Sequence, residues 1–143
     1  ETLTNQPVPQ FDPSAALSVY RAYYSCVTSG RILSAHDISE GGLAVTLAEM
    51  AFSGKAGLDI TLDAATPSII ALFNETPGQI VIEVSPANAA AVKSAFAGLP
   101  IREIGTATAS HARLSVTQGE KTILNEDIAE LKALWKGGLA RWY

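Results

Sequence analysis

The sequence lacks the residues that would build a disulfide, a cysteine zinc site or a surface for polyanions. Cys26 is the only cysteine in the 143-residue chain, so neither an intrachain disulfide nor a cysteine zinc site can form. The ten lysine and arginine residues are scattered, and the net charge is −4 with an isoelectric point near 5.1. Because phosphate binding needs clustered basic side chains, no nucleic-acid partner is expected.

Long apolar runs are also missing. No stretch approaches the length needed to cross a bilayer and the N-terminus has no signal-peptide pattern, so we expect no membrane partner and a cytoplasmic location. The chain begins at Glu1 rather than at a methionine, and we interpret it as a fragment of a longer protein. Only 17% of its residues are charged, so some apolar surface is expected to meet a neighbouring domain or a second copy. Self-association is therefore predicted.

The residues that are present predict one domain at 12–143, preceded by an extended arm or linker at 1–11. Asp12 and Pro13 are an N-cap and a first-turn proline, and they predict a helix that ends at Gly30. The side chains expected on the buried face of this helix, from their helical spacing, are Ala16, Tyr20, Tyr23 and Val27.

Strands and helices then alternate before a group of strands near the end of the chain. Apolar or alternating patterns predict strands at 31–36, 58–62, 79–84, 101–108, 113–116 and 121–124. Further helices are predicted at 43–52, 67–73, 86–98 and from 126 onward, with a glycine pair weakening the last one. The expected fold class is therefore α/β of the α+β type, a mixed sheet with packed helices rather than a purely parallel doubly wound sheet.

The first candidate site is the segment from Ser34 to Leu43, in which the polar loop from His36 to Gly42 follows the end of a strand and opens a helix. Gly41 and Gly42 allow close approach of a ligand or another backbone, and the free N–H groups of a helix start favour anions. Asp37 and Ser39 are also good N-cap residues, so the loop can equally be a simple helix cap. The residues leave both interpretations open.

The second candidate is the segment from Leu72 to Gln79, directly before a strand. Its polar side chains, among them Glu75 and Thr76, lie around the Pro-Gly pair that ends at Gly78 and could hydrogen-bond a polar ligand. The same residue types are those that ordinary turns prefer. Composition alone favours an ordinary turn.

The remaining reactive or aromatic side chains favour structural roles. His36 has no second histidine near it in sequence, since His111 is distant, so no metal site is predicted. Cys26 lies in a helical pattern among tyrosines, which predicts a buried structural thiol rather than a nucleophile. Trp135 and Trp142 are predicted to be core or interface anchors.

Both loops resemble a known family. The run SAHDISEGGL at 34–43, continued by LAEM and Ala-Phe at 47–52, is similar to the second C-terminal-type domain of the phosphoribosylformylglycinamidine synthases. Further similar blocks are the Val8-Pro9 arm, residues 72–75 with the strand at 79–84, and the Ile-Gly turn at 104–106. The wider superfamily includes aminoimidazole ribonucleotide (AIR) synthetase, selenophosphate synthetase, thiamine-phosphate kinase and a hydrogenase maturation protein.

The resemblance implies an AIR-synthase C-terminal-domain-like fold and a part in purine biosynthesis. Members of the family are ATP- and magnesium-dependent ligases that convert formylglycinamide ribonucleotide and glutamine-derived ammonia into formylglycinamidine ribonucleotide. The implied partners are the N-terminal synthetase domains, a small bridging subunit and a glutaminase subunit or domain, whose nucleophile is not Cys26. In the family the N-terminal domains hold the catalytic histidine and most Mg–ATP ligands. The resemblance therefore assigns no catalytic residue, metal or cofactor to 1–143 alone.

The resemblance also implies substrate or nucleotide contacts in both loops. A Glu-Ser-Gln turn contacts substrate in the first half of the family's synthetase, and Glu75-Thr76 occupies the equivalent turn here, with a departure from that pattern. The implied binding residues are Asp37, Ser39, Gly41, Gly42, Glu75, Thr76, Gly78 and Gln79. Two alternatives stay open: the C-terminal domain of another superfamily member, and a docking module without ligand chemistry.

Overall fold

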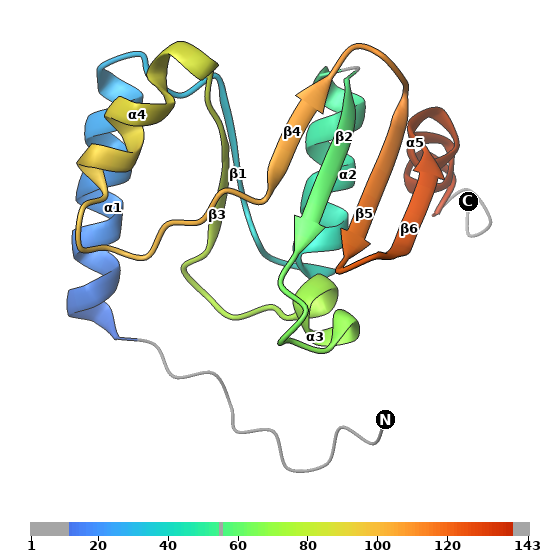
Figure 1. Ribbon diagram of the computed structural model, residues 1–143, viewed down its shortest axis with the longest axis horizontal. Helices are drawn as coiled ribbons and strands as arrows, with labels where there is room; N and C mark the ends of the chain where they lie inside the picture. The colour runs from blue at the N-terminus through green and yellow to red at the C-terminus, as the bar shows by residue number, and fades with distance from the viewer. Residues whose placement is uncertain (1–11, 55, 139–143) are drawn as a thin grey trace.

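The strands form two separate sheets. The computed structural model describes residues 12–54 and 56–138, and in these ranges β1 (Ser34–Asp37) and β3 (Ile80–Glu83) form an antiparallel pair. The second sheet has the order β4 (Gly105–Thr108), β2 (Gly57–Leu62), β5 (Arg113–Gln118) and β6 (Lys121–Asp127). Strand β2 pairs parallel with β5, and the other pairs are antiparallel. The prediction of mixed pairing is confirmed, although the strands are divided between two sheets (Figure 1).

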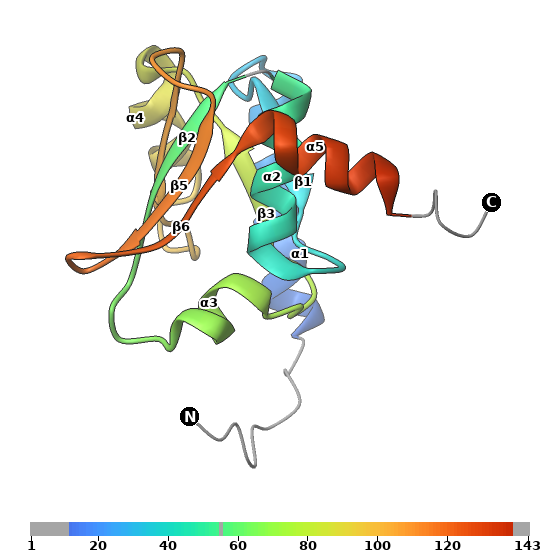
Figure 2. The same ribbon diagram turned by 90° about the vertical axis from the view of Figure 1, so that its right-hand side faces the viewer.

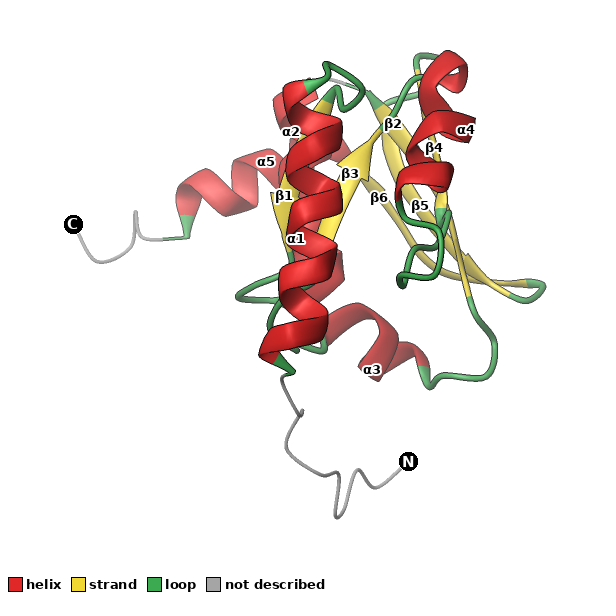
Figure 3. Ribbon diagram, turned by 90° about the vertical axis from the view of Figure 1, so that its left-hand side faces the viewer, coloured by secondary structure: helices red, strands yellow, loops and turns green. Residues whose placement is uncertain are grey.

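Helices pack against both sheets. Their bounds are α1 Pro13–Thr28, α2 Gly42–Gly54, α3 Ser68–Phe73, α4 Pro86–Ala95 and α5 Ile128–Gly137. Helices α1 and α4 lie beside the β1–β3 pair, and α1 crosses in front of it in Figure 3. Helix α5 lies against α2 at the other end of the molecule (Figure 2). None of these helices, in the ranges that the structure describes, is long and apolar enough to cross a membrane.

The main core lies between α2, α3 and the four-stranded sheet. Alternate residues of β2 point to this core, which is why Ile60 and Leu62 are buried while Thr61 is exposed. Burying one such side chain stabilises the fold by about 1.5–3 kcal/mol. The buried members of the cluster are Leu43, Leu47, Ile60, Leu62, Leu72, Leu114 and Val116.

A smaller core joins α1, α4 and the β1–β3 pair around Cys26, Val92 and Phe96. The buried thiol predicted at Cys26 is confirmed. The predicted buried face of α1 is partly wrong, because Tyr20 and Val27 are 40% and 43% exposed. The residues that α1 turns toward this core are Val19, Ala22, Tyr23 and Cys26, a face rotated away from the predicted one.

Several predicted strands begin at other residues than expected. The first strand begins at Ser34, and Leu33 before it is 62% exposed, so a buried strand over 31–36 is wrong. The strand predicted from Ile101 begins only at Gly105, where the backbone passes so close to Asp59 that a side chain would overlap it. The arm at 1–11 and Trp142 lie outside the described residues. The other predicted helices and strands are confirmed to within a few residues.

Candidate functional site

The two polar loops, distant in sequence, are joined by two hydrogen bonds, one of them from the backbone N–H of Ile38 to the Gln79 carbonyl at 2.9 Å. The backbone N–H of Gly41 donates to Glu75 Oε1 at 2.8 Å. Gly41 directly precedes α2, so the Glu75 carboxylate lies at the positive end of the helix dipole. A carboxylate in this position satisfies an N–H group that the helix itself cannot pair. Glu75 therefore caps α2 from a different loop.

Asp37 and Ser39, the two capping candidates, act through their backbones. The Ser39 carbonyl accepts from the N–H of Gly42 at 3.0 Å. The Asp37 carbonyl accepts from Thr46 Oγ1 at 3.1 Å, which satisfies a hydroxyl that is almost fully buried in α2. Neither side chain takes the capping position that Glu75 fills; both line the cleft described below, and Asp37 Oδ1 also lies 3.5 Å from His36 Nδ1.

The glycine pair serves the packing of α2. Gly41 and Gly42 have φ angles of 80° and 65°, a region that favours glycine. A Cβ atom on Gly42 would lie 2.7 Å from Leu72 O and 2.7 Å from Phe73 Cα. The start of α2 therefore approaches the backbone at the end of α3. Gly42 is buried in this contact and does not line the cleft described below.

The second loop is an ordered turn held by its own side chains. The Asn74 Oδ1 atom accepts from the N–H of Thr76 at 2.7 Å and also bonds the Thr76 hydroxyl. Gly78 has a φ of 87°, and Gln79 Nε2 donates to the Thr76 carbonyl at 3.3 Å. The turn chemistry predicted from composition is confirmed, and the same turn presents Glu75 to α2.

The two loops and α1 enclose a cleft of about 410 Å³, which we call the loop cleft. Its lining residues are Tyr20, Asp37, Ile38, Ser39, Glu75, Pro77, Gly78, Gln79 and Ile80. Five of the eight predicted contacts are among them: Asp37, Ser39, Glu75, Gly78 and Gln79. Thr76 belongs to the same turn and Gly41 bonds Glu75, but neither lines the cleft.

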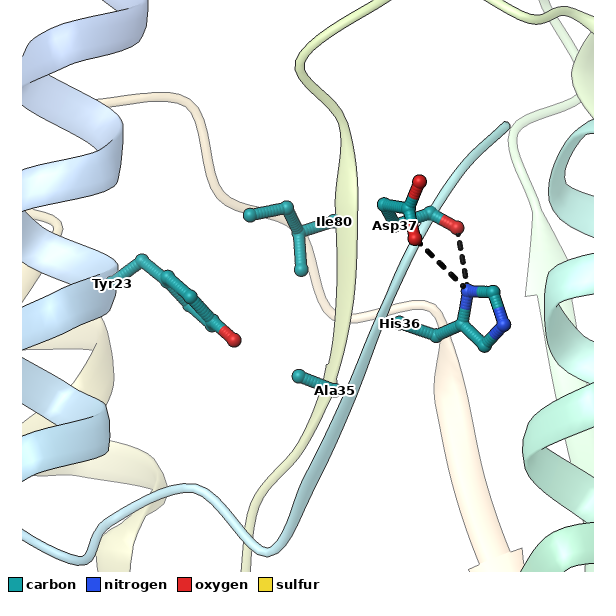
Figure 4. A pocket seen from close by; sticks show the side chains of 5 residues that line it. All are labelled: Tyr23, Ala35, His36, Asp37 and Ile80. Atoms are coloured by element: carbon teal, nitrogen blue, oxygen red, sulfur yellow. Dashed lines mark hydrogen bonds and ion pairs between the residues drawn. The ribbon is translucent and has the colours of Figure 1, made fainter.

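Sequence reasoning missed the part of α1 that faces this cleft. Tyr20 was assigned to the core because it fits the helical period, and a one-dimensional pattern does not show which of two apolar faces is buried. A second cavity of about 340 Å³ lies next to the loop cleft and shares Asp37 and Ile80 with it. Figure 4 shows Tyr23 pointing from α1 toward this cavity, while His36 lies on the far side of β1.

His36 is held between two carboxylate-bearing residues. Its Nδ1 atom lies 2.7 Å from the Asp37 carbonyl oxygen and 3.5 Å from Asp37 Oδ1, the contacts dashed in Figure 4. Its Nε2 atom lies 3.0 Å from Glu49 Oε2 on α2. In the described ranges, no three His, Cys, Asp or Glu side chains are grouped in a way that could hold a metal ion.

The loop cleft is acidic and rich in hydrogen-bonding groups. Its lining carries the carboxylates of Asp37 and Glu75, the hydroxyls of Tyr20 and Ser39 and the amide of Gln79, and among the described residues no lysine or arginine lines it. Such a surface can accept hydrogen bonds from ribose hydroxyls or from the N–H groups of a base or amide. It offers no cation for a phosphate, and Glu75 already occupies the N–H of Gly41.

Comparison with known proteins identifies relatives of much greater length. The phosphoribosylformylglycinamidine synthase subunit PurL of Lactobacillus helveticus is 41% identical over 113 residues, which are 79% of this chain and 14% of that protein. The same subunit of Carboxydothermus hydrogenoformans is 32% identical over 136 residues, 94% of this chain and 18% of the relative. The chain therefore spans less than a fifth of the length of these relatives.

Solved structures share the fold. The structure of PurLQS from Thermotoga maritima superposes with a TM-score of 0.77 at 17% identity, over 90% of this chain and 23% of that one. Hydrogenase maturation protein HypE in complex with ATP gives a TM-score of 0.59 at 19% identity, over 78% of this chain and 41% of that one. A family model described as AIR synthase related protein, C-terminal domain, matches residues 2–117, most of the chain. The chain thus belongs to the AIR synthase related protein, C-terminal domain family, as its two loops predicted.

Proposed function

We propose that this chain is a C-terminal-type domain of a phosphoribosylformylglycinamidine synthase and that it contributes the loop cleft to a larger substrate-binding region. The observation that supports this most is the bond from Gly41 to Glu75, which brings together the two loops that resemble the family. The similarity to the PurL subunits points to the same enzyme. In the full-length protein, the reaction would convert formylglycinamide ribonucleotide to its amidine with ATP and glutamine-derived ammonia.

The residues of the loop cleft do not fit the triphosphate of ATP. In the part of the chain that the structure describes, no basic side chain lines the cleft, and the helix start that could bind a phosphate is capped by Glu75. We therefore assign ATP and magnesium to the N-terminal synthetase domains, and ammonia supply to a glutaminase partner joined through a small bridging subunit. Asp37, Ser39, Glu75 and Gln79 instead suit contacts to the ribose or amide groups of a ribonucleotide. Thr76 and Gly78 would support the turn that positions them.

The binding role is tested by titration calorimetry on the full-length protein with formylglycinamide ribonucleotide and with purine nucleotides. We expect saturable binding that is weakened in the Glu75→Ala variant. The matched control is Asp12→Ala, which removes the cap of α1, a helix start that is distant in sequence from both loops. Equal affinity in wild type and Glu75→Ala would favour the docking module. Turnover by residues 1–143 alone would contradict the assignment of catalysis to other domains.

We also propose that the isolated chain associates with a second copy through an exposed apolar face of α1, which includes Tyr20 and therefore borders the loop cleft. Four exposed apolar side chains form a stripe at helical spacing on this face: Leu17, Tyr20, Tyr24 and Val27. The only charged residue within the bounds of α1 is Arg21, so little repulsion opposes contact between two such faces. A stripe of this kind marks an interaction surface more often than a solvated one.

Sedimentation at increasing concentration tests this association. Tyr24 is 69% exposed, and a Tyr24→Lys substitution places a charge in the stripe without disturbing the core, so it should shift the protein toward the monomer. Ser25→Lys adds the same charge beside the stripe and should leave the association unchanged. A wild-type chain that stays monomeric at high concentration would contradict the proposal.

A further inference from the structure

Helix α1 forms one wall of both cavities beside the polar loops. Tyr20 lines the loop cleft, and Tyr23, almost one turn further along α1, lines the second cavity. Figure 4 shows Tyr23 extending from α1 toward the side chains of Ala35 and Ile80 on the β1–β3 pair. The width of both cavities therefore depends on where α1 lies.

Within the described residues, every hydrogen bond of α1 is local. These bonds run within the helix, to its cap Asp12, and from the turn that follows, where the N–H of Arg31 donates to the Cys26 carbonyl at 3.0 Å. In the same ranges, no ion pair joins α1 to another element. Helix α2, by contrast, is bound to a separate loop by the hydrogen bond from Gly41 to Glu75. Directional contacts thus fix the position of α2 but not that of α1.

Apolar contacts hold α1 in place, and they belong to the smaller core around Cys26, Val92 and Phe96, which we call the small core. Neighbouring residues of β3 point to opposite faces of the β1–β3 pair, so Ile82 packs on the small core whereas Val81 packs on the main core. None of the described residues that pack on the main core comes from α1 or α4. The strand pair therefore separates two cores that share no side chain.

The first turns of α1 contribute little to the small core. From Pro13 to Ser18, every residue except Ala16 is exposed, and the buried residue of α1 is Cys26. Because the stabilisation from packing grows with the apolar area removed from water, α1 gains little from it. A helix of 16 residues is also marginally stable by itself in water. Loss of the small core should therefore release α1 as a whole and expose its amides to solvent.

We infer that α1 is a lid on the loop cleft, which opens together with α4 as one unit while the main core stays folded. Because Tyr20 belongs to α1, each opening removes this wall of the cleft and lets a ligand enter or leave. Access to the cleft then depends on the packing of Cys26 against Val92, and not on the two polar loops alone. The role as a lid rests on the proposed function, which takes the loop cleft as a binding site, whereas the opening of α1 needs no ligand.

The reaction of Cys26 with an aromatic disulfide reagent measures this opening in the 143-residue chain. Cys26 is the only cysteine and is 0% exposed, so its thiol should react only when the small core opens. Val92→Ala removes two methyl groups from the small core and should accelerate the reaction about tenfold, the factor that corresponds to about 1.4 kcal/mol. The matched control is Val116→Ala, the same substitution in the main core, which should leave the rate unchanged. Equal acceleration in the two variants, or none in Val92→Ala, would overturn the inference.

Amide hydrogen exchange in the wild type keeps the lid testable if a variant does not fold. The amides of Cys26 in α1 and of Ala51, buried in α2, are followed at guanidinium concentrations below the unfolding transition. An opening limited to α1 and α4 exposes less surface than global unfolding, so exchange at Cys26 should be faster and should depend less steeply on denaturant than exchange at Ala51. Equal rates and slopes at the two amides would overturn the lid, even where calorimetry shows that a ligand binds. Absence of ligand binding would instead contradict the proposed function, whatever these rates are.

Discussion

The starts of α1 and α2 satisfy the same chemical need in different ways. At α1, Asp12 precedes the helix and its Oδ1 atom accepts from the N–H groups of Ser14 at 2.8 Å and Ala15 at 3.2 Å. At α2, the N–H of Gly41 is bonded by Glu75, which is 34 residues away in sequence. The first cap involves only its own turn, whereas the second ties a helix to a separate loop.

This difference explains why the start of α2 forms part of a cleft. A local cap leaves the chain before it free of tertiary constraint, and its loss affects one turn. A remote cap requires both loops to be in place at once, and at α2 it acts together with the hydrogen bond from the Ile38 N–H to the Gln79 carbonyl at 2.9 Å. The following substitutions test this difference between the starts of α1 and α2.

The largest effect is expected from Gly42→Ala. The new Cβ would overlap the backbone of Leu72 and Phe73 in addition to forcing a positive φ, and we expect a loss of about 3 kcal/mol or more in the free energy of unfolding. The control is Gly30→Ala after α1, where φ is 67° but nothing lies within 4 Å of the added atom. That variant should lose about 1 kcal/mol. Equal losses in denaturant unfolding would contradict the close contact of α2 with α3.

A smaller effect is expected from removing each cap. Glu75→Ala and Asp12→Ala should each lower the free energy of unfolding by about 1 kcal/mol, the usual value of a cap. Only Glu75→Ala should also change the NMR shifts of both polar loops, because only that cap bridges them. The distinction between the two helix starts would be lost if the NMR shifts of the polar loops changed in Asp12→Ala. It would also be lost if they stayed unchanged in Glu75→Ala.

The smallest effect on stability is expected from an exposed ion pair at the end of α4. Lys93, in the last turn of α4, donates to Glu103 Oε2 at 2.7 Å. This hydrogen bond, and then the charge of Lys93, lower the pKa of the Glu103 carboxyl. A lowered pKa means that the stabilising contribution is present above the ordinary carboxyl pKa and is lost as pH falls through the lowered value. It is expected to be small because the pair is exposed.

Lys93→Met should raise the pKa of Glu103 toward its ordinary value with little change in thermal stability. Titration of the Glu103 side chain by NMR measures this, and Lys136→Met on α5 is the control. An unchanged Glu103 pKa would show that the pair does not persist in solution. The pair is local to α4 and the segment after it, so neither polar loop should respond.

Much of the fold could be predicted from local signals. Asp12, Pro13 and Gly30 set the bounds of α1, and alternation in β2 marked the strand that enters the main core. The face of α1 could not be predicted, because both of its sides carry apolar residues at helical spacing. Only the position of α4 and of the β1–β3 pair determines which side is covered.

The candidate site was predicted as two separate loops. Turn chemistry identified Asn74 and Gly78, and the glycine pair identified the start of α2. That Glu75 would cap Gly41 could not be predicted, since the bond depends on how α3 places the turn against α2. The contacts of Glu49 with His36 on β1 and Trp135 on α5 could not be predicted either, because these partners come from distant parts of the chain.

Amide hydrogen exchange at Gly41 tests the junction of the two loops most directly. If Glu75 caps this N–H in solution, its exchange should be about tenfold faster in Glu75→Ala than in wild type, the factor that corresponds to about 1.4 kcal/mol. The amide of Ser14, bonded by Asp12, should exchange at the same rate in both proteins. Equal exchange at Gly41 in the two proteins would show that the loops are not joined by Glu75.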